Sequence, residues 1–171
     1  TNGKTTTTYL IESVLHRAGK GSGVIGTINT RYLGREVTSS LTTPGPVDLF
    51  EMLDTMRSHG VEVCVMEVSS HALDQDRIAG LAFRYALFTN LSQDHLDYHK
   101  DMESYFLAKR RLFIDHLEGP AVLNTDDRYG RRLADELPGA VSYGLAPGAL
   151  IHPVSMENKA DGLTLSLTGP G

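Results

Sequence analysis

Thr1-Asn2-Gly3-Lys4-Thr5 opens the chain and determines how the rest of the sequence is interpreted. Glycine followed by lysine and threonine is the closing half of a phosphate-binding loop, G-x-x-x-x-G-K-[ST], in which backbone N–H groups and the lysine meet phosphate oxygens and the hydroxyl holds Mg²⁺. The leading glycine of a complete loop would lie upstream of Thr1. Because Thr and Asn also favour helix N-termini, this stretch alone is equally compatible with a polar turn that caps a helix.

Short apolar runs alternate with amphipathic stretches along most of the sequence. The first amphipathic stretch predicts a helix over residues 4–18, with an apolar stripe of Leu10, Ile11, Val14, Leu15 and Ala18. Further helices are predicted between Leu49 and Gly60, over 102–117, and after Asp126 or Asp127 as N-cap. Buried strands are predicted at 23–28, 61–69, 86–91 and 121–124. This order predicts an α/β fold with a mostly parallel sheet of the P-loop type and helices on both faces.

Two segments depart from this alternation. Residues 29–40 predict a surface hairpin that turns at Gly34. Residues 140–171 predict a small β-rich part that ends in a hairpin joined through Asp161-Gly162. We expect residues 1–171 to form one domain that is truncated at both ends.

Composition and charge exclude several classes of protein. The chain has 171 residues, of which 40% are hydrophobic, which suits a globular domain with its own core. A formal net charge of −5 argues against a broad nucleic-acid-binding surface. No apolar run approaches the roughly 18 residues of a membrane span. The single cysteine, Cys64, lies in an apolar run and is interpreted as a core residue in a reducing compartment. We therefore expect a cytoplasmic monomer without nucleic-acid or membrane partners.

Polar residues follow several predicted strands, at the sheet edge where α/β proteins bind ligands. Glu67 ends an apolar strand, where a carboxylate is costly unless it meets a cation, so we favour Mg²⁺ over a buried salt bridge. His95 follows the next strand. Imidazole is a less common Mg²⁺ ligand than carboxylate, so the residue type alone favours a structural hydrogen-bonding role for His95, as for His71 and His99.

Lys109 stands on the apolar stripe of the predicted helix at 102–117. A lysine there must extend its amine to solvent, meet an anion or lose its charge. Extension to solvent is the ordinary outcome. The alternative is a neutral amine that reacts with CO₂ to form a carbamate, whose anionic oxygens can bind Mg²⁺.

Five blocks of sequence together resemble the central domain of the Mur ligases. They are TNGKTT at 1–6, TTP at 42–44, MEVSSHAL at 66–73, TNLSQDHLD at 89–97 and YFLAK at 105–109. The resemblance covers nearly the whole chain and is strongest to members that add the third residue of the peptidoglycan stem peptide. In this family an N-terminal domain holds UDP, the central domain holds ATP and a C-terminal domain brings the amino acid.

The resemblance implies a reaction. ATP phosphorylates the D-glutamyl carboxylate of UDP-N-acetylmuramoyl-L-Ala-D-Glu, and the amine of diaminopimelate or lysine displaces phosphate from the acyl phosphate. The choice between the two amino acids belongs to the C-terminal domain. The chain alone is expected to be inactive.

The resemblance also implies roles for individual residues. Thr5 and Glu67 would hold one Mg²⁺, and His95 with carbamylated Lys109 a second, so that Lys4, His95 and Lys109 are the implied catalytic residues. The implied ATP-binding residues are Thr1, Asn2, Gly3, Lys4, Thr5 and Thr6, with Lys4 at the outer phosphates. The implied residues for the muramoyl peptide are Thr42, Thr43, Ser69, Gln75 and Arg77. Leu41 departs from some members, which carry Asn at this position, so one substrate hydrogen bond of those members is not carried over to this chain.

Two other functions remain open. A folylpolyglutamate synthase has a similar ATP-binding domain and a lysine of this type. The TTP and EVSSHAL blocks nevertheless favour the muramoyl enzyme. A non-catalytic P-loop nucleotide-binding module would not need Lys109 as a carbamate.

Overall fold

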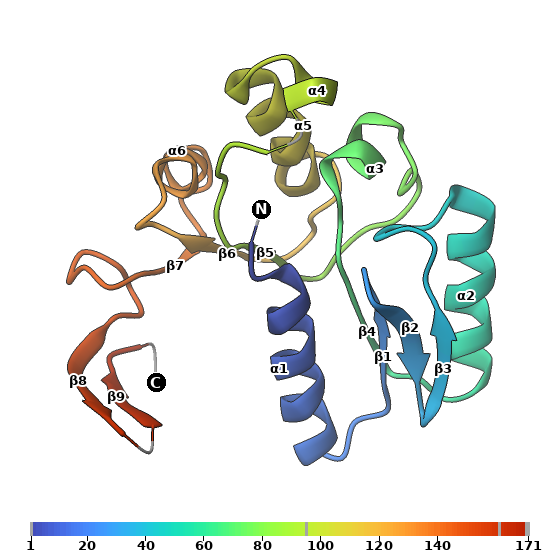
Figure 1. Cartoon of the computed structure of the whole chain (residues 1–171), viewed down its shortest axis with the longest axis horizontal. Helices are drawn as coiled ribbons and strands as arrows, with labels where there is room; N and C mark the ends of the chain where they lie inside the picture. The colour runs from blue at the N-terminus through green and yellow to red at the C-terminus, as the bar shows by residue number, and fades with distance from the viewer. Residues whose placement is uncertain (1, 95, 161, 170–171) are drawn as a thin grey trace. The chain divides into compact units, whose positions relative to one another are not determined.

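The computed structural model describes residues 2–94, 96–160 and 162–169 (Figure 1). They group into two units, one from Gly3 to Leu81 and one that consists of Asn2 and the chain from Ala82 onward. No helix in the described part of the chain is long and apolar enough to cross a membrane.

The first unit contains a mixed four-stranded sheet. Its elements are α1 (Lys4–Arg17), β1 (Ser22–Ile25), β2 (Asn29–Tyr32), β3 (Arg35–Thr38), α2 (Pro46–Ser58), β4 (Val63–Met66) and α3 (Ser70–Asp74). The strand order is β3-β2-β1-β4. β1 and β4 are parallel, whereas β2 pairs antiparallel with both β1 and β3. The predicted hairpin is confirmed, and its turn places Gly34 at a φ of 80°, which glycine adopts without strain.

The predicted apolar stripe of α1 is only partly buried. Leu10 and Val14 are 63% and 68% exposed, whereas Ile11 and Leu15 are half-buried. The physical reason is that α1 packs on β1 and β4, and the sheet covers only the flank of the helix that carries Ile11 and Leu15. Helical periodicity identifies apolar residues but not which of them a neighbouring element covers.

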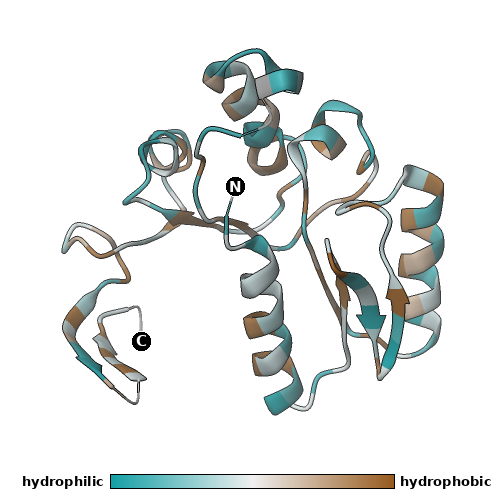
Figure 2. Cartoon of the chain, in the orientation of Figure 1, coloured by the Kyte–Doolittle hydropathy of each residue, from teal (hydrophilic) through white to brown (hydrophobic). Residues whose placement is uncertain are grey.

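The second unit contains a parallel three-stranded sheet. Its elements are β5 (Ala86–Phe88), α4 (Leu96–His99), α5 (Met102–Ile114), β6 (Ala121–Asn124), α6 (Arg128–Glu136) and β7 (Val141–Tyr143). The strand order is β5-β6-β7, with Leu87 opposite Val122 and Leu123 opposite Ser142. Both parallel sheet segments confirm the predicted α/β class, and Figure 2 shows apolar colour along β4 and β6.

The β7 strand corrects one expectation. It lies within the range predicted as a separate β-rich part, but it pairs with β6 and so belongs to the parallel sheet. The terminal hairpin, β8 (Pro153–Lys159) and β9 (Gly162–Leu167), is antiparallel as predicted. Asp161, which the sequence places at its turn, lies outside the described residues.

Buried aromatic and aliphatic side chains form the core of the second unit. Phe88, Phe106, Phe113, Leu123 and Leu133 are all fully or almost fully buried. Asp127 is the N-cap of α6, because its Oδ1 accepts hydrogen bonds from the backbone N–H groups of Tyr129 (2.8 Å) and Gly130 (3.3 Å). Of the two aspartates that the sequence offered as caps, the structure uses the second.

Candidate functional site

Gly3 forms the turn that starts α1. Its φ of 82° is left-handed, a conformation that suits glycine. The Gly3 carbonyl accepts hydrogen bonds from the Thr7 backbone N–H (2.9 Å) and the Thr7 hydroxyl (2.8 Å). The first turn of this 14-residue helix carries no acidic side chain, so its N–H groups and positive dipole end are suited to an anion. Lys4 is half-buried and Thr6 is exposed, while Thr1 lies outside the described residues.

Glu67 follows β4 and is 2% exposed. The Thr5 hydroxyl lies 3.0 Å from each of its carboxylate oxygens. The carboxylate also accepts hydrogen bonds from the Thr27 backbone N–H (2.9 Å) and hydroxyl (3.1 Å). Within residues 2–94, 96–160 and 162–169, no basic side chain forms an ion pair with Glu67, so the described structure does not contain the buried salt bridge that was the alternative.

Thr43 connects the loop before α2 to the end of β4. Its side chain is fully buried. The hydroxyl donates to the Glu67 carbonyl (2.9 Å) and accepts from the Ser69 backbone N–H (3.0 Å). Both hydrogen bonds hold the backbone on either side of Val68. Thr42 reaches the same region, since its hydroxyl lies 3.1 Å from the Thr27 hydroxyl.

Arg77 joins the remaining predicted substrate residues. Its guanidinium donates to Gln75 Oε1 from Nε (2.9 Å) and from a terminal nitrogen (2.6 Å), and to the Thr43 carbonyl (3.0 Å). Ser69 caps α3, because its Oγ accepts from the Ala72 N–H (3.1 Å). The structure therefore brings Thr42, Thr43, Ser69, Gln75 and Arg77 into one region of the first unit.

Lys109 lies in the second unit on α5 and is 9% exposed. The predicted position on a buried stripe is confirmed, and the side chain does not extend into solvent. Its Nζ lies 5.5 Å from the centroid of the Tyr105 ring. His99 is buried and stacks on Tyr105, with 4.9 Å between ring centroids. His95, the other predicted ligand of the second metal, lies outside the described residues.

Helix α5 begins at a well-formed cap. The Asp101 carboxylate accepts a hydrogen bond from the Ser104 backbone N–H (2.7 Å). Hydrogen bonds from Ser104 to the ionised carboxylate lower the pKa of Asp101. The cap thus fixes the start of the helix that carries Lys109.

Asn90 is a site residue to which sequence reasoning gave no role. Its side-chain Oδ1 accepts from the Asn2 backbone N–H (2.9 Å), and its Nδ2 donates to the Asn2 carbonyl (3.0 Å). The next residue, Leu91, donates its N–H to Asp127 Oδ2 (2.9 Å). The signals in the sequence were the position of Asn90 near the C-terminal end of a predicted strand and its place in the block TNLSQDHLD.

Among the described residues, no three acidic, histidine or cysteine side chains gather in one place to hold a metal ion. Thr5 and Glu67 instead form a hydroxyl and carboxylate pair, and oxygen ligands of this type suit Mg²⁺, which keeps several waters and uses one or two protein carboxylates together with phosphate oxygens.

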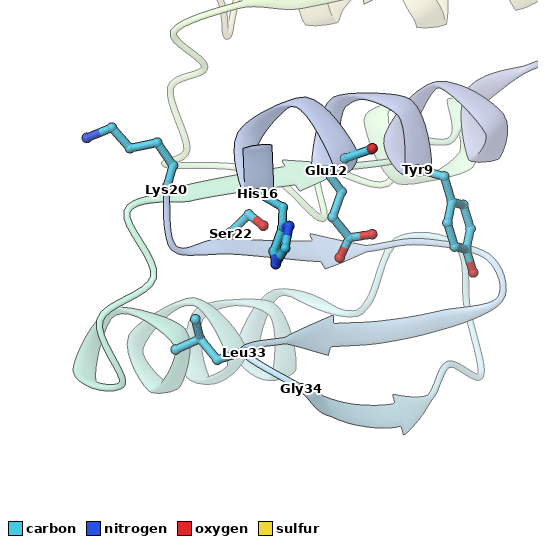
Figure 3. A pocket seen from close by; sticks show the side chains of 8 residues that line it. Tyr9, Glu12, His16, Lys20, Ser22, Leu33 and Gly34 are labelled. Carbon is cyan, nitrogen blue, oxygen red and sulfur yellow. The ribbon is translucent and has the colours of Figure 1, made fainter. Parts of the chain in front are cut away.

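A cavity of about 400 Å³ lies beside α1 in the first unit (Figure 3). It is lined by Tyr9, Glu12, Ser13, His16, Lys20, Ser22, Leu33 and Gly34. None of the predicted site residues that the structure describes lines this cavity. Two of its walls already contact Arg31, whose guanidinium lies 3.8 Å from the Tyr9 ring centroid and 2.7 Å from Glu12 Oε2.

The chain is similar in sequence to curated ligases across nearly its whole length. The chain is 46% identical over 178 residues to the UDP-N-acetylmuramoyl-L-alanyl-D-glutamate–2,6-diaminopimelate ligase of Geobacter metallireducens, across 99% of the chain and 35% of that protein. It is 47% identical over 173 residues to the ligase of the same name from Thermosynechococcus vestitus, with 99% and 35% covered. The chain thus spans about a third of the length of these curated relatives.

Solved structures agree with the sequence relatives. A structure of a UDP-N-acetylmuramoyl-L-alanyl-D-glutamate–2,6-diaminopimelate ligase superposes with a TM-score of 0.86 at 31% identity, covering 99% of this chain and 36% of that one. MurF from Acinetobacter baumannii shares the fold, with a TM-score of 0.67 at 18% identity, covering 99% of this chain and 34% of that one. The family model of the Mur ligase middle domain matches residues 1–170. The chain therefore belongs to the Mur ligase family and corresponds to its middle domain.

Proposed function

We propose that this chain is the ATP-binding part of a ligase that adds diaminopimelate to UDP-N-acetylmuramoyl-L-alanyl-D-glutamate in peptidoglycan synthesis. The observation that carries the proposal is the Thr5 to Glu67 hydrogen bond, which joins the phosphate-loop threonine to a buried carboxylate at the end of a parallel strand. The names of the relatives support diaminopimelate over lysine as the amino acid. We further propose a cytoplasmic monomer with no nucleic-acid or membrane partner.

The reaction consists of two displacements. A carboxylate oxygen of D-glutamate attacks the γ-phosphorus of ATP, the bond to the β-phosphate oxygen breaks, and ADP leaves with the electron pair. The amine nitrogen of the amino acid then attacks the acyl carbon. The bond from carbon to the phosphate oxygen breaks, phosphate leaves with that electron pair, and the nitrogen loses a proton to solvent or a base. The products are an amide, ADP and phosphate.

The residues at the start of α1 bind and orient ATP in this proposal. In this scheme the backbone N–H groups of Gly3 and Thr6 would meet phosphate oxygens, and Lys4 would compensate the charge of the outer phosphates. Asn2 would keep the loop in place, because its own N–H donates to Asn90 Oδ1. Thr1 is assigned to ATP binding only because of its place in the sequence, since it lies outside the described residues. Thr5 and Glu67 would hold Mg²⁺, whose charge would compensate that of the phosphates.

Lys109 and His95 are proposed to hold a second Mg²⁺. For Lys109 this requires a carbamate: the neutral amine nitrogen bonds to the carbon of CO₂, one C=O π pair moves onto oxygen, and the nitrogen releases a proton to water. The burial of Lys109 supports this role, because its side chain does not extend into solvent, which was the ordinary alternative for a lysine on this stripe.

The muramoyl peptide is proposed to bind near Thr42, Ser69, Gln75 and Arg77. Arg77 offers a planar guanidinium to an anionic group of the substrate. Thr43 belongs to this region, but its buried hydroxyl already has two backbone partners. We therefore propose that Thr43 supports Ser69 and Glu67 instead of touching substrate.

The test is ADP release by the whole ligase that contains this chain. With UDP-N-acetylmuramoyl-L-Ala-D-Glu, the enzyme should respond to diaminopimelate and not to lysine, and it should not use folate with glutamate. Activity only with folate would favour the folylpolyglutamate alternative. Lys4→Ala and Lys109→Ala should each abolish ADP release, and normal turnover in Lys109→Ala would exclude the carbamate role. The chain alone should release no ADP.

A further inference from the structure

We infer that Tyr105 and His99 are positioning residues that fix and orient Lys109. This inference rests on the proposed function, in which Lys109 acts as a carbamate. The two aromatic residues do not touch substrate in this scheme. They set where the Lys109 nitrogen lies and in which direction a carbamate can extend.

Tyr105 lies one helical turn before Lys109 on α5, so both side chains project from the same side of the helix. The Lys109 Nζ lies over the Tyr105 ring at 5.5 Å from its centroid, within the range of a cation–π contact. Tyr105 is only 1% exposed, and its ring therefore has little freedom to rotate. A lysine has four rotatable side-chain bonds, and this ring is a fixed surface against which the end of the chain rests.

His99 holds the Tyr105 ring in place. The two rings stack with 4.9 Å between centroids and 15° between their planes. Tyr98 meets His99 edge-on, at 4.8 Å and 78°. His99 is itself 5% exposed, so the stack is part of the interior of the second unit.

The same stack joins two segments of the proposed metal site. His99 is the last residue of α4, and α4 begins at Leu96, directly after His95 in the sequence. Tyr105 and Lys109 belong to α5. Contact between His99 and Tyr105 therefore fixes the helix that follows one proposed ligand against the helix that carries the other.

The ring also directs a carbamate by electrostatics. The face of an aromatic ring is electron-rich and attracts an ammonium group, but it repels an anion. When the Lys109 amine becomes a carbamate, its two oxygens are expected to turn away from the Tyr105 face. The Tyr105 ring then holds the nitrogen, and the oxygens that would bind Mg²⁺ point away from the face of the ring.

The experiment uses the whole ligase with ¹³C-labelled bicarbonate and no ATP. The carbamate carbon is measured by ¹³C NMR, and Lys109→Ala identifies the signal by removing it. In a separate assay, the Mg²⁺ concentration for half-maximal activity is determined. Tyr105→Leu and His99→Ala each remove one ring of the stack, whereas Tyr105→Phe and His99→Phe keep a ring at that position. Phe106→Leu is the matched control, because it removes a neighbouring buried ring from the same helix.

We expect Tyr105→Leu and His99→Ala to shift or broaden the carbamate ¹³C signal, because its oxygens are no longer held in one orientation. Both variants should raise the Mg²⁺ requirement about 10- to 100-fold, as loss of a residue that supports a metal ligand does. The two Phe variants should behave like the wild type. Phe106→Leu should lower Tm without changing the carbamate signal or the Mg²⁺ requirement.

Three outcomes would overturn the inference. The first is a normal carbamate signal and Mg²⁺ requirement in Tyr105→Leu, or in His99→Ala if Tyr105→Leu does not fold. The second is failure of His99→Phe to restore what His99→Ala loses, which would assign His99 a role other than stacking. The third is a wild-type enzyme with no carbamate and an active Lys109→Ala variant. This third result would refute the proposed carbamate role itself, whereas the first two leave that role intact.

Discussion

The Thr5 hydroxyl lies 3.0 Å from both carboxylate oxygens of Glu67. The hydroxyl has one proton, so it donates to the two oxygens as a shared or alternating hydrogen bond. A threonine from the first turn of α1 and a carboxylate from the end of β4 thus meet although 62 residues separate them in the sequence. Both side chains offer oxygen atoms, the ligand type that Mg²⁺ prefers, and two predictions depend on this pair.

Glu67→Gln is expected to raise the Mg²⁺ requirement of the whole ligase by roughly 10- to 100-fold, since it removes the negative charge from a proposed metal ligand. The amide also places a donor opposite the Thr27 N–H or hydroxyl, which now donate to the carboxylate. Activity measured against Mg²⁺ concentration checks the prediction. Glu51→Gln, at an exposed position on α2, is the control and should leave the curve unchanged. An unchanged curve for Glu67→Gln would refute metal ligation by Glu67.

Gly26→Ala is expected to disturb the same carboxylate from a different direction. A Cβ at this position would lie 2.5 Å from Glu67 Oε1, so the carboxylate must move. We expect a loss of about 1–3 kcal/mol in the free energy of unfolding, as for other overpacked sites, together with a raised Mg²⁺ requirement. Chemical denaturation and Mg²⁺ titration measure the two effects. Gly148→Ala, where an added Cβ meets no atom within 4 Å, should change neither. A wild-type Mg²⁺ response in Gly26→Ala would show that the Glu67 carboxylate need not keep its present position.

Asn90→Asp is expected to raise the KM for ATP of the whole ligase by about tenfold or more, which corresponds to the loss of one or two hydrogen bonds. The amide of Asn90 pairs with both the N–H and the carbonyl of Asn2, the residue before the phosphate-loop glycine. An aspartate can still accept from the N–H, but its second oxygen would face the Asn2 carbonyl, and two acceptors repel.

The control for Asn90→Asp is Asn158→Asp, the same change at an exposed position in β8. It should leave the KM for ATP and the KM for the UDP substrate unchanged. If Asn90→Asp raised the KM for the UDP substrate as much as the KM for ATP, a general structural defect would explain the result better than a displaced phosphate loop.

Local sequence patterns predicted the elements of the fold well, for identifiable physical reasons. Gly34 was placed correctly in a turn and Lys109 on a buried helix face, and Asp127 was one of two candidates for a helix cap. Each of these features depends on residues within one or two turns of the chain. The parallel pairing of β7 with β6 was missed, since apolar runs report that a strand exists but not which strand lies beside it.

The site was less predictable than the elements for the same reason. Buried Glu67 was expected from its place after an apolar strand, but its hydrogen bonds to Thr27 were not, because 40 residues separate them. The pairing of Asn90 with the Asn2 backbone spans 88 residues and leaves no periodic signal. Contacts of this kind arise only when the sheet edge has formed.

Cys64 makes the stability of the fold depend on pH in the alkaline range. The thiol lies on β4 opposite Gly23 of β1, and burial raises its pKa to about 12. In the unfolded chain a thiol titrates near its ordinary pKa of about 8.5. Between these two pH values the unfolded state releases the proton while the folded state keeps it. The unfolded state therefore binds fewer protons, and the free energy of unfolding must fall as pH rises, by up to about 1.4 kcal/mol per pH unit for this one group. Below the unfolded pKa the contribution is fully present.

Comparison of the wild type with Cys64→Ala isolates that contribution. Denaturation curves from pH 7 to pH 11 should show the wild type losing stability relative to the variant above about pH 8.5, because alanine has no proton to release. Iodoacetamide should label the folded protein slowly at pH 8.5 and the urea-unfolded protein quickly, since only the thiolate reacts. A constant stability difference between the two proteins across this range, or rapid labelling of the folded protein, would show that the Cys64 thiol is not shielded from water between β1 and its neighbours.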